Sequence, residues 1–130
     1  MNTQTNIVVK FVMEGFHYWK DAPKQVAFLR DNHRHLFHFR LEKKVDHADR
    51  DIEIILFGRQ VKEYLIKRYG SKSSEDLSGS NIYWLEFGPR SCEMIGEDLM
   101  RTFNLDVAEV LEDGENGSIT YKFQQTLSQQ

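Results

Sequence analysis

Two histidines at the start of an alternating segment could bring their imidazoles to one point. His33 and His35 are two positions apart in the sequence. Residues i and i+2 of an extended strand point to the same face of a sheet. The same face then continues with the apolar residues Phe37, Phe39 and Leu41. This segment therefore predicts a strand face with possible metal ligands at one end and core residues at the other.

A third ligand would complete a catalytic zinc site, in which three protein ligands leave one coordination position open. His17 lies on an earlier apolar segment and His47 lies in a charged turn, so His17 is the better candidate. Three neutral imidazoles suit zinc, because its closed-shell ion imposes no geometry of its own. The alternative is that these histidines are structural or solvent-exposed. His38 would point away from the pair in a regular strand.

Two carboxylates and one cysteine are further candidates for chemistry. Glu93 falls in the first turn of a predicted helix, where its alternative role is to stabilise the helix dipole. Glu112 ends a predicted strand, where the alternative is a solvated charge. Cys92 fits a small buried residue, because a reactive thiol needs a lowered pKa and no base is evident beside it.

The composition indicates a globular protein with one domain over residues 1–130. Hydrophobic residues make up 40% and charged residues 28%, with a net charge of −3. Both signs are interspersed, whereas a general nucleic-acid binder would carry a basic stripe. No apolar run is long enough to span a membrane, and the polar N-terminal stretch lacks a signal-peptide core. A single cysteine cannot form an internal disulfide, so we expect a reducing, cytoplasmic compartment.

Hydrophobic periodicity predicts the secondary structure in chain order. The first half should contain a strand at 7–14 that could run on to 19, a short helical turn at 25–30, a strand at 33–45, an extended run at 52–57, and a helix at 59–69 closed by Gly70. A polar loop at 71–80 and a short strand or packed loop at 81–87 should follow. The last part should contain a helix that starts near Ser91, then strands at 105–112 and 118–123 joined by a DG/NG hairpin turn. This order, ββααββ, predicts an α+β domain with a four-stranded antiparallel sheet and two helices on one face.

The arrangement of these residues resembles the 6-pyruvoyl- and 6-carboxy-tetrahydropterin synthase family. In that family a histidine on the first strand precedes an HGHNY motif, and here His17 precedes the run HRHLF that starts at His33. The segment IILF at 54–57, followed by Val61 and Lys62, stands where the family has a run ending in DF and its helix. The segment RSCE at 90–93 stands at the family's PT-x-E helix start. Glu112 and Tyr121 stand at its last glutamate and tyrosine.

The resemblance implies a tunnelling fold whose subunits join their sheets into an oligomeric barrel, as a homo-oligomer such as a hexamer. His17, His33 and His35 would bind zinc, which would polarise substrate oxygens as a Lewis acid. Glu93 would accept paired N–H donors from the aminopyrimidine edge of a pterin or purine-like ligand. Glu112 would line the same pocket.

The sequence also departs from the family pattern at residues that carry the family's reaction. The family's catalytic cysteine lies just before HGH, but residues 28–32 contain no cysteine. Its Asp-His pair is absent, no histidine follows His47, and Leu56 replaces the aspartate of DF. Proton transfer at carbon needs a positioned acid and base. Asp31, next to the missing cysteine, is the nearest substitute as a catalytic residue.

Two functions follow from the resemblance, and the sequence leaves open whether the protein is an enzyme. The first is a divergent zinc-dependent carbon–oxygen lyase that acts on dihydroneopterin triphosphate or a related pterin, in a pterin or queuosine-type pathway. The second is a non-catalytic oligomer that binds or sequesters a pterin, purine or nucleotide-derived ligand through Glu93. A third reading is a structural module without a small ligand.

Overall fold

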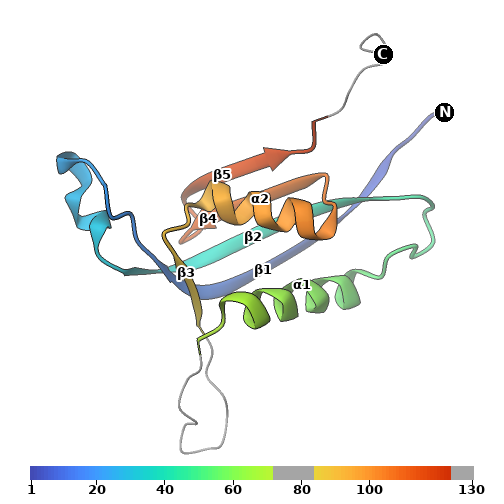
Figure 1. Cartoon of the computed structure of the whole chain (residues 1–130). Coiled ribbons are helices and arrows are strands. Elements are labelled where there is room, and N and C mark those ends of the chain that lie inside the picture. Colours follow the sequence, from blue (N-terminus) through green and yellow to red (C-terminus); the bar gives the residue numbers. More distant parts are fainter. Residues whose placement is uncertain (72–83, 124–130) are drawn as a thin grey trace, which may run out of the picture.

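The computed structural model describes residues 1–71 and 84–123, which form an α+β unit around one mixed sheet (Figure 1). The sheet has the strand order β3-β1-β2-β4-β5. Its strands are β1 (Thr5–His17), β2 (His33–Val45), β3 (Leu85–Gly88), β4 (Val107–Glu112) and β5 (Asn116–Tyr121). The helices are the 3₁₀ helix η1 (Lys24–Arg30) and the α-helices α1 (Ile54–Tyr69) and α2 (Cys92–Phe103). In this part of the chain, no helix has the length and apolar character needed to cross a membrane.

The two long strands β1 and β2 form the centre of the sheet, and alternation along them separates its two faces. They pair antiparallel over their whole length, from Thr5 opposite Val45 to His17 opposite His33. Phe37, Phe39 and Leu41 of β2 are almost fully buried, as their spacing predicted. Each such side chain contributes about 1.5–3 kcal/mol when it leaves water. Both α-helices cover this face, so the core lies between them and the sheet (Figure 1).

Helix α1 begins earlier than the sequence pattern indicated, and the prediction of an extended run at 52–57 is wrong. The carboxylate of Glu53 accepts the backbone N–H groups of Ile55 and Leu56, which caps the helix start. Residues at a spacing of four then face the sheet and are buried: Phe57, Val61, Leu65 and Tyr69. The helix ends at Tyr69 as predicted, but Gly70 has φ −64° rather than a left-handed conformation. A Cβ at Gly70 would lie 2.3 Å from the carbonyl oxygen of Ile66, so a glycine is needed there for space.

Helix α2 starts where the sequence predicted. The hydroxyl of Ser91 accepts the backbone N–H of Met94 at 3.2 Å and caps the first turn. Ile95 and Leu99 are fully buried against the sheet. Asn104 ends the helix in a left-handed conformation with φ 52°, which asparagine tolerates better than most residues.

The sheet contains a fifth strand that the predicted antiparallel arrangement did not include. The four predicted strands are present as β1, β2, β4 and β5, and all of their pairings are antiparallel. Strand β3 adds to the other edge of β1 and runs parallel to it. Of the predicted segments at 71–80 and 81–87, residues 72–83 lie outside the described residues. The short helical turn predicted near 25–30 is present as η1.

A buried carboxylate joins the two α-helices. Asp98 of α2 accepts hydrogen bonds from the hydroxyls of Tyr64 and Tyr69 of α1, at 2.8 and 2.6 Å. It also accepts one from Thr102, and Arg68 lies 3.4 Å away. Burial alone would raise the pKa of Asp98, but these hydrogen bonds and the arginine charge lower its pKa overall.

Candidate metal centre and pocket

Three histidines meet at the end of the β1–β2 pair that the connecting segment 18–32 joins, next to β3. The β1–β2 register places His17 directly opposite His33, and His35 follows two residues later on the same face. The ring centroids are 4.5 Å apart for His17 and His33, 5.0 Å for His33 and His35, and 5.3 Å for His17 and His35. One ligand atom from each residue lies within 4.8 Å of the others. These three side chains could therefore form a metal site.

The hydrogen bonds around the rings leave one nitrogen of each histidine free to bind a metal. Each Nδ1 donates to an oxygen, so the neutral ring presents Nε2 with its lone pair. The acceptors for His17, His33 and His35 are the Arg90 carbonyl at 2.9 Å, the Asp31 carbonyl at 2.9 Å and the Asp113 carboxylate at 2.7 Å. Histidines that ligate metals usually donate their other ring N–H in this way.

In the described part of the chain, two buried ring nitrogens have no hydrogen bond while the rings are neutral. Within residues 1–71 and 84–123, Nε2 of His17 and Nε2 of His35 are buried without a hydrogen-bond partner. A buried polar atom left in this state costs about 1–3 kcal/mol. A cation held between the rings would remove that cost, so the donor set fits a metal ion.

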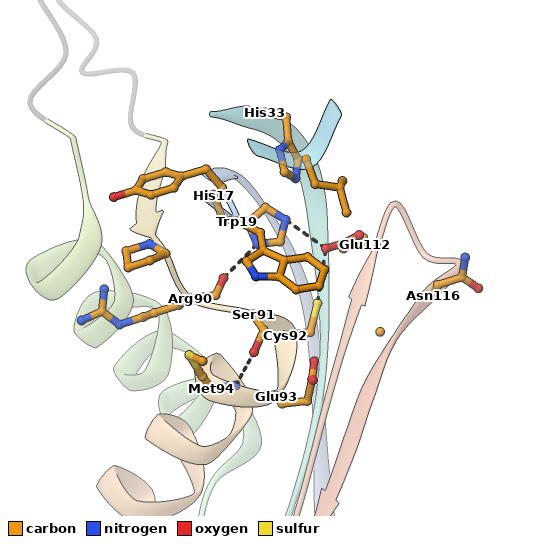
Figure 2. Close-up of a pocket in the computed structure, with 14 residues that line it drawn as sticks. His17, Trp19, His33, Arg90, Ser91, Cys92, Glu93, Met94, Glu112 and Asn116 are labelled. Atoms are coloured by element: carbon orange, nitrogen blue, oxygen red, sulfur yellow. Dashed lines mark hydrogen bonds and ion pairs between the residues drawn. The ribbon is translucent and has the colours of Figure 1, made fainter. Parts of the chain in front are cut away.

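The carboxylate of Glu112 lies beside the same two nitrogens, and Figure 2 shows its contact with His17. Its Oε2 is 3.0 Å from Nε2 of His17, and its Oε1 is 3.5 Å from Nε2 of His35. Contact with His17 lowers the pKa of Glu112, although burial opposes this shift. Burial opposes protonation of His17, but Glu112 and the Arg90 carbonyl outweigh it and raise the pKa of His17. The carboxylate is therefore ionised at neutral pH.

Cys92 lies on the other side of Glu112, at the start of α2 (Figure 2). Its Sγ is 3.7 Å from Oε2 of Glu112, and the residue is 4% exposed. Burial and the Glu112 charge raise the pKa of Cys92 to about 12. The thiol therefore stays protonated and donates to the carboxylate. This agrees with its reading from the sequence as a small buried residue.

A cavity of about 520 Å³ opens next to His17 and His33. This volume is in the range of pockets that hold small molecules. Its apolar lining residues are Tyr18, Trp19, Leu29, Pro89 and Met94, and its polar lining residues include Arg90, Ser91, Glu93, Glu112 and Asn116. Trp19 is half exposed and lines the cavity, so part of its indole is available to a ligand there.

The structure brings most of the predicted site residues to this cavity. Glu93 lines it from the exposed side of α2, and Glu112 reaches it from the end of β4. Asp31 is exposed and is not among the lining residues; its backbone carbonyl contacts His33 instead. His38 lies beside the hairpin turn at Gly114, away from the histidine cluster.

Sequence reasoning missed three contributors to the site. Asp113 was assigned only to the hairpin turn, although its position directly after Glu112 on a paired strand could have indicated a contact with His35. Arg90 acts through its backbone carbonyl, for which residue type gives no signal. Trp19 is two residues after His17, so the alternation that could run on to residue 19 was a signal for it, although β1 ends at His17.

Comparisons with known proteins give a match at the level of the fold. No protein-family model matches the sequence, and no curated protein matches it. The solved structure of 6-pyruvoyl tetrahydropterin synthase from Plasmodium falciparum matches with a TM-score of 0.56 at 14% identity, over 95% of this chain and 100% of that chain. An uncharacterized protein from Wolinella succinogenes matches with a TM-score of 0.52 at 12% identity, over 94% of this chain and 100% of that chain.

The chain has the tunnelling fold of 6-pyruvoyl tetrahydropterin synthase. At these identities the likeness concerns the fold. The expected α+β architecture, with helices on one face of the sheet, is thereby confirmed.

Proposed function

We propose that this chain is a zinc-binding protein like 6-pyruvoyl- and 6-carboxy-tetrahydropterin synthases, which takes a pterin or purine-like ring into the pocket beside its histidines. The observation that carries the proposal is the convergence of His17, His33 and His35, with every Nδ1 engaged and two buried Nε2 atoms lacking a partner. The shared fold supports it.

Zinc is the proposed ion because imidazole nitrogen is one of its preferred donors. When bound, it would supply Lewis-acid polarisation of substrate oxygens. The chain itself fixes the ligands: the carbonyls of Arg90 and Asp31 and the carboxylate of Asp113 set the ring orientations before an ion arrives.

The pocket offers complementary surfaces for a flat heterocycle. Trp19 and Tyr18 lie on its apolar side, where a planar ring can stack against an aromatic face. Glu93 lines the polar side, where its carboxylate can accept two parallel N–H donors from an aminopyrimidine edge. Together these groups would select a ring that is apolar on its faces and carries paired donors along one edge.

For the enzymatic form of this proposal, we propose lyase-type chemistry on dihydroneopterin triphosphate or a related pterin. The second candidate is binding without turnover, and two observations bear on the choice between the two. The Cys92 thiol, with its pKa at about 12, is a poor base. Asp31 does not line the pocket. Neither residue therefore replaces the family's catalytic cysteine in an evident way.

We further propose that the chain forms a homo-oligomer in which several sheets join. Large apolar side chains are exposed on the sheet face away from the helices: Val8, Val12, Leu36, Ile119 and Tyr121. An apolar sheet face of this kind is expected to be covered by another surface. Light scattering of the purified chain would measure the subunit number, and a strict monomer would refute this part of the proposal.

Titration of the zinc-loaded protein with dihydroneopterin triphosphate, followed by product analysis, tests the proposed function. We expect tight binding that Glu93→Gln weakens at least about tenfold, because a neutral amide cannot accept two charge-assisted N–H bonds. Glu97→Gln is the matched control, since Glu97 is exposed one turn later on the same helix. Product formation selects the lyase, and retention without product selects the binding protein. Absence of binding, or equal binding by Glu93→Gln, would refute the pocket assignment.

A further inference from the structure

The distances from Glu112 to His17 and His35 fit a ligand of the same ion. In a tetrahedral site with metal–ligand distances of about 2.0–2.1 Å, neighbouring ligand atoms lie about 3.3 Å apart. The oxygens of Glu112 lie 3.0 Å from Nε2 of His17 and 3.5 Å from Nε2 of His35, on either side of that value.

The hydrogen bonds on the far side of the rings strengthen this argument. Because Nδ1 of His17 and Nδ1 of His35 donate to other oxygens, the Nε2 atoms of the neutral rings have no proton to give to Glu112. A carboxylate oxygen and an imidazole lone pair then face each other across 3.0 Å. Two acceptors at that distance repel each other unless a proton or a metal cation lies between them.

Glu112 also has the outer contact that ligands to metals usually have. The Cys92 thiol donates to Oε2 at 3.7 Å and orients the carboxylate from behind. All four groups around the centre therefore have a partner outside it: a backbone carbonyl for His17 and for His33, the Asp113 carboxylate for His35, and Cys92 for Glu112.

We propose that Glu112 is a fourth ligand of the metal ion that His17, His33 and His35 bind. This inference rests on the proposed metal site and changes its character. The centre becomes a three-nitrogen, one-oxygen set with one anionic ligand, instead of an open site made of neutral imidazoles. With zinc bound, a substrate oxygen would have to compete with the Glu112 carboxylate for the ion.

The experiment uses the full chain, stripped with a chelator and reloaded with cobalt(II), whose visible absorption reports ligand type and coordination number. The variants are Glu112→Gln and Glu112→Asp, which remove or retract the carboxylate. The matched control is Glu109→Gln on the same strand, because Glu109 lies three residues away and on the opposite face of the sheet. Zinc affinity is measured in parallel by chelator competition, and circular dichroism shows whether each variant is folded.

We expect Glu112→Gln to change the cobalt spectrum and to weaken zinc binding at least about tenfold, the lower limit for losing even an outer-shell partner. Glu112→Asp should fall between wild type and Glu112→Gln, and Glu109→Gln should match wild type. Identical spectra and affinities for wild type and Glu112→Gln would overturn the inference and make Glu112 an ion-pair partner of a protonated His17. A wild-type protein that binds no metal would overturn the proposed metal site as well.

Discussion

Gly15 should be intolerant of even a methyl group, because two core rings occupy the space above it. It lies on β1 two residues before His17 and opposite His35. A Cβ at this position would approach ring carbons of Phe37 and Phe87 to 2.9 Å, and both rings are fully buried. Gly15→Ala must therefore displace at least one ring from a packed core.

The expected cost of Gly15→Ala is that of overpacking, about 1–3 kcal/mol. With an unfolding entropy of roughly 2.1 cal/mol/K per residue over the chain, this corresponds to a fall in Tm of about 4–11 °C. The same displacement should weaken metal binding, because the Phe37 ring packs edge-on against His17 and His35.

Gly58→Ala is the matched control for this experiment. Gly58 is inside α1, and an added Cβ would have Val9 Cγ1 as its nearest neighbour at 4.0 Å. Alanine is favoured over glycine in a helix interior by about 0.8–1 kcal/mol, so the Tm of this variant should rise by a few degrees. Thermal unfolding followed by circular dichroism measures both. A Gly15→Ala protein as stable as wild type would refute the packing argument.

Two further substitutions test single contacts. Asp98→Asn should lower the free energy of unfolding at pH 7 by about 1.5–3 kcal/mol, the range for hydrogen bonds to a charged group. Because the folded-state pKa of Asp98 is lowered, its contribution is present above the unfolded pKa of 3.8 and is lost as the pH falls through the folded value. Urea unfolding should therefore show the difference between variant and wild type shrinking in acid, and a pH-independent difference would contradict this reasoning. Asp113→Asn should reduce metal affinity about 10–100-fold, because both carboxylate oxygens accept hydrogen bonds, from the Leu36 N–H and from Nδ1–H of His35, and asparagine keeps only one acceptor oxygen. Asparagine tolerates the positive φ of 55° at this position, so the turn should survive, and unchanged affinity in chelator competition would exclude the orienting role.

Local sequence patterns were sufficient to predict a strand with alternating residues and a helix with a recognisable N-cap. Strand β2 runs from His33 to Val45 as predicted, since its buried apolar residues recur at every second position. Helix α2 starts after Ser91 because its cap is in the sequence. The start of α1 was mispredicted because its first turn contains branched aliphatic residues typical of strands, and the decisive contact is a carboxylate cap from Glu53. Val61 and Leu65 are four residues apart, and extending this spacing back to Phe57 would have indicated the earlier helix start.

Side-chain types and strand periodicity were sufficient to predict the histidine cluster, but not the contacts around it. His33 and His35 share a face by alternation, and His17 meets them because the hairpin register pairs it with His33. The contacts that fix the rings could not be predicted, because two of them use backbone carbonyls. Strand β3 could not be predicted as a parallel neighbour of β1 either, since that pairing depends on how α1 returns the chain to the sheet.

The most direct test of this account is elemental analysis of the purified chain, with His33→Ala as the comparison. His33 is only partly buried, so its removal should leave the fold intact while it deletes one ligand of the centre. We expect zinc at one ion per chain in wild type and a large loss of bound zinc in folded His33→Ala. Equal zinc in the two proteins, or none in wild type expressed with added zinc, would contradict the metal centre on which the proposed function depends.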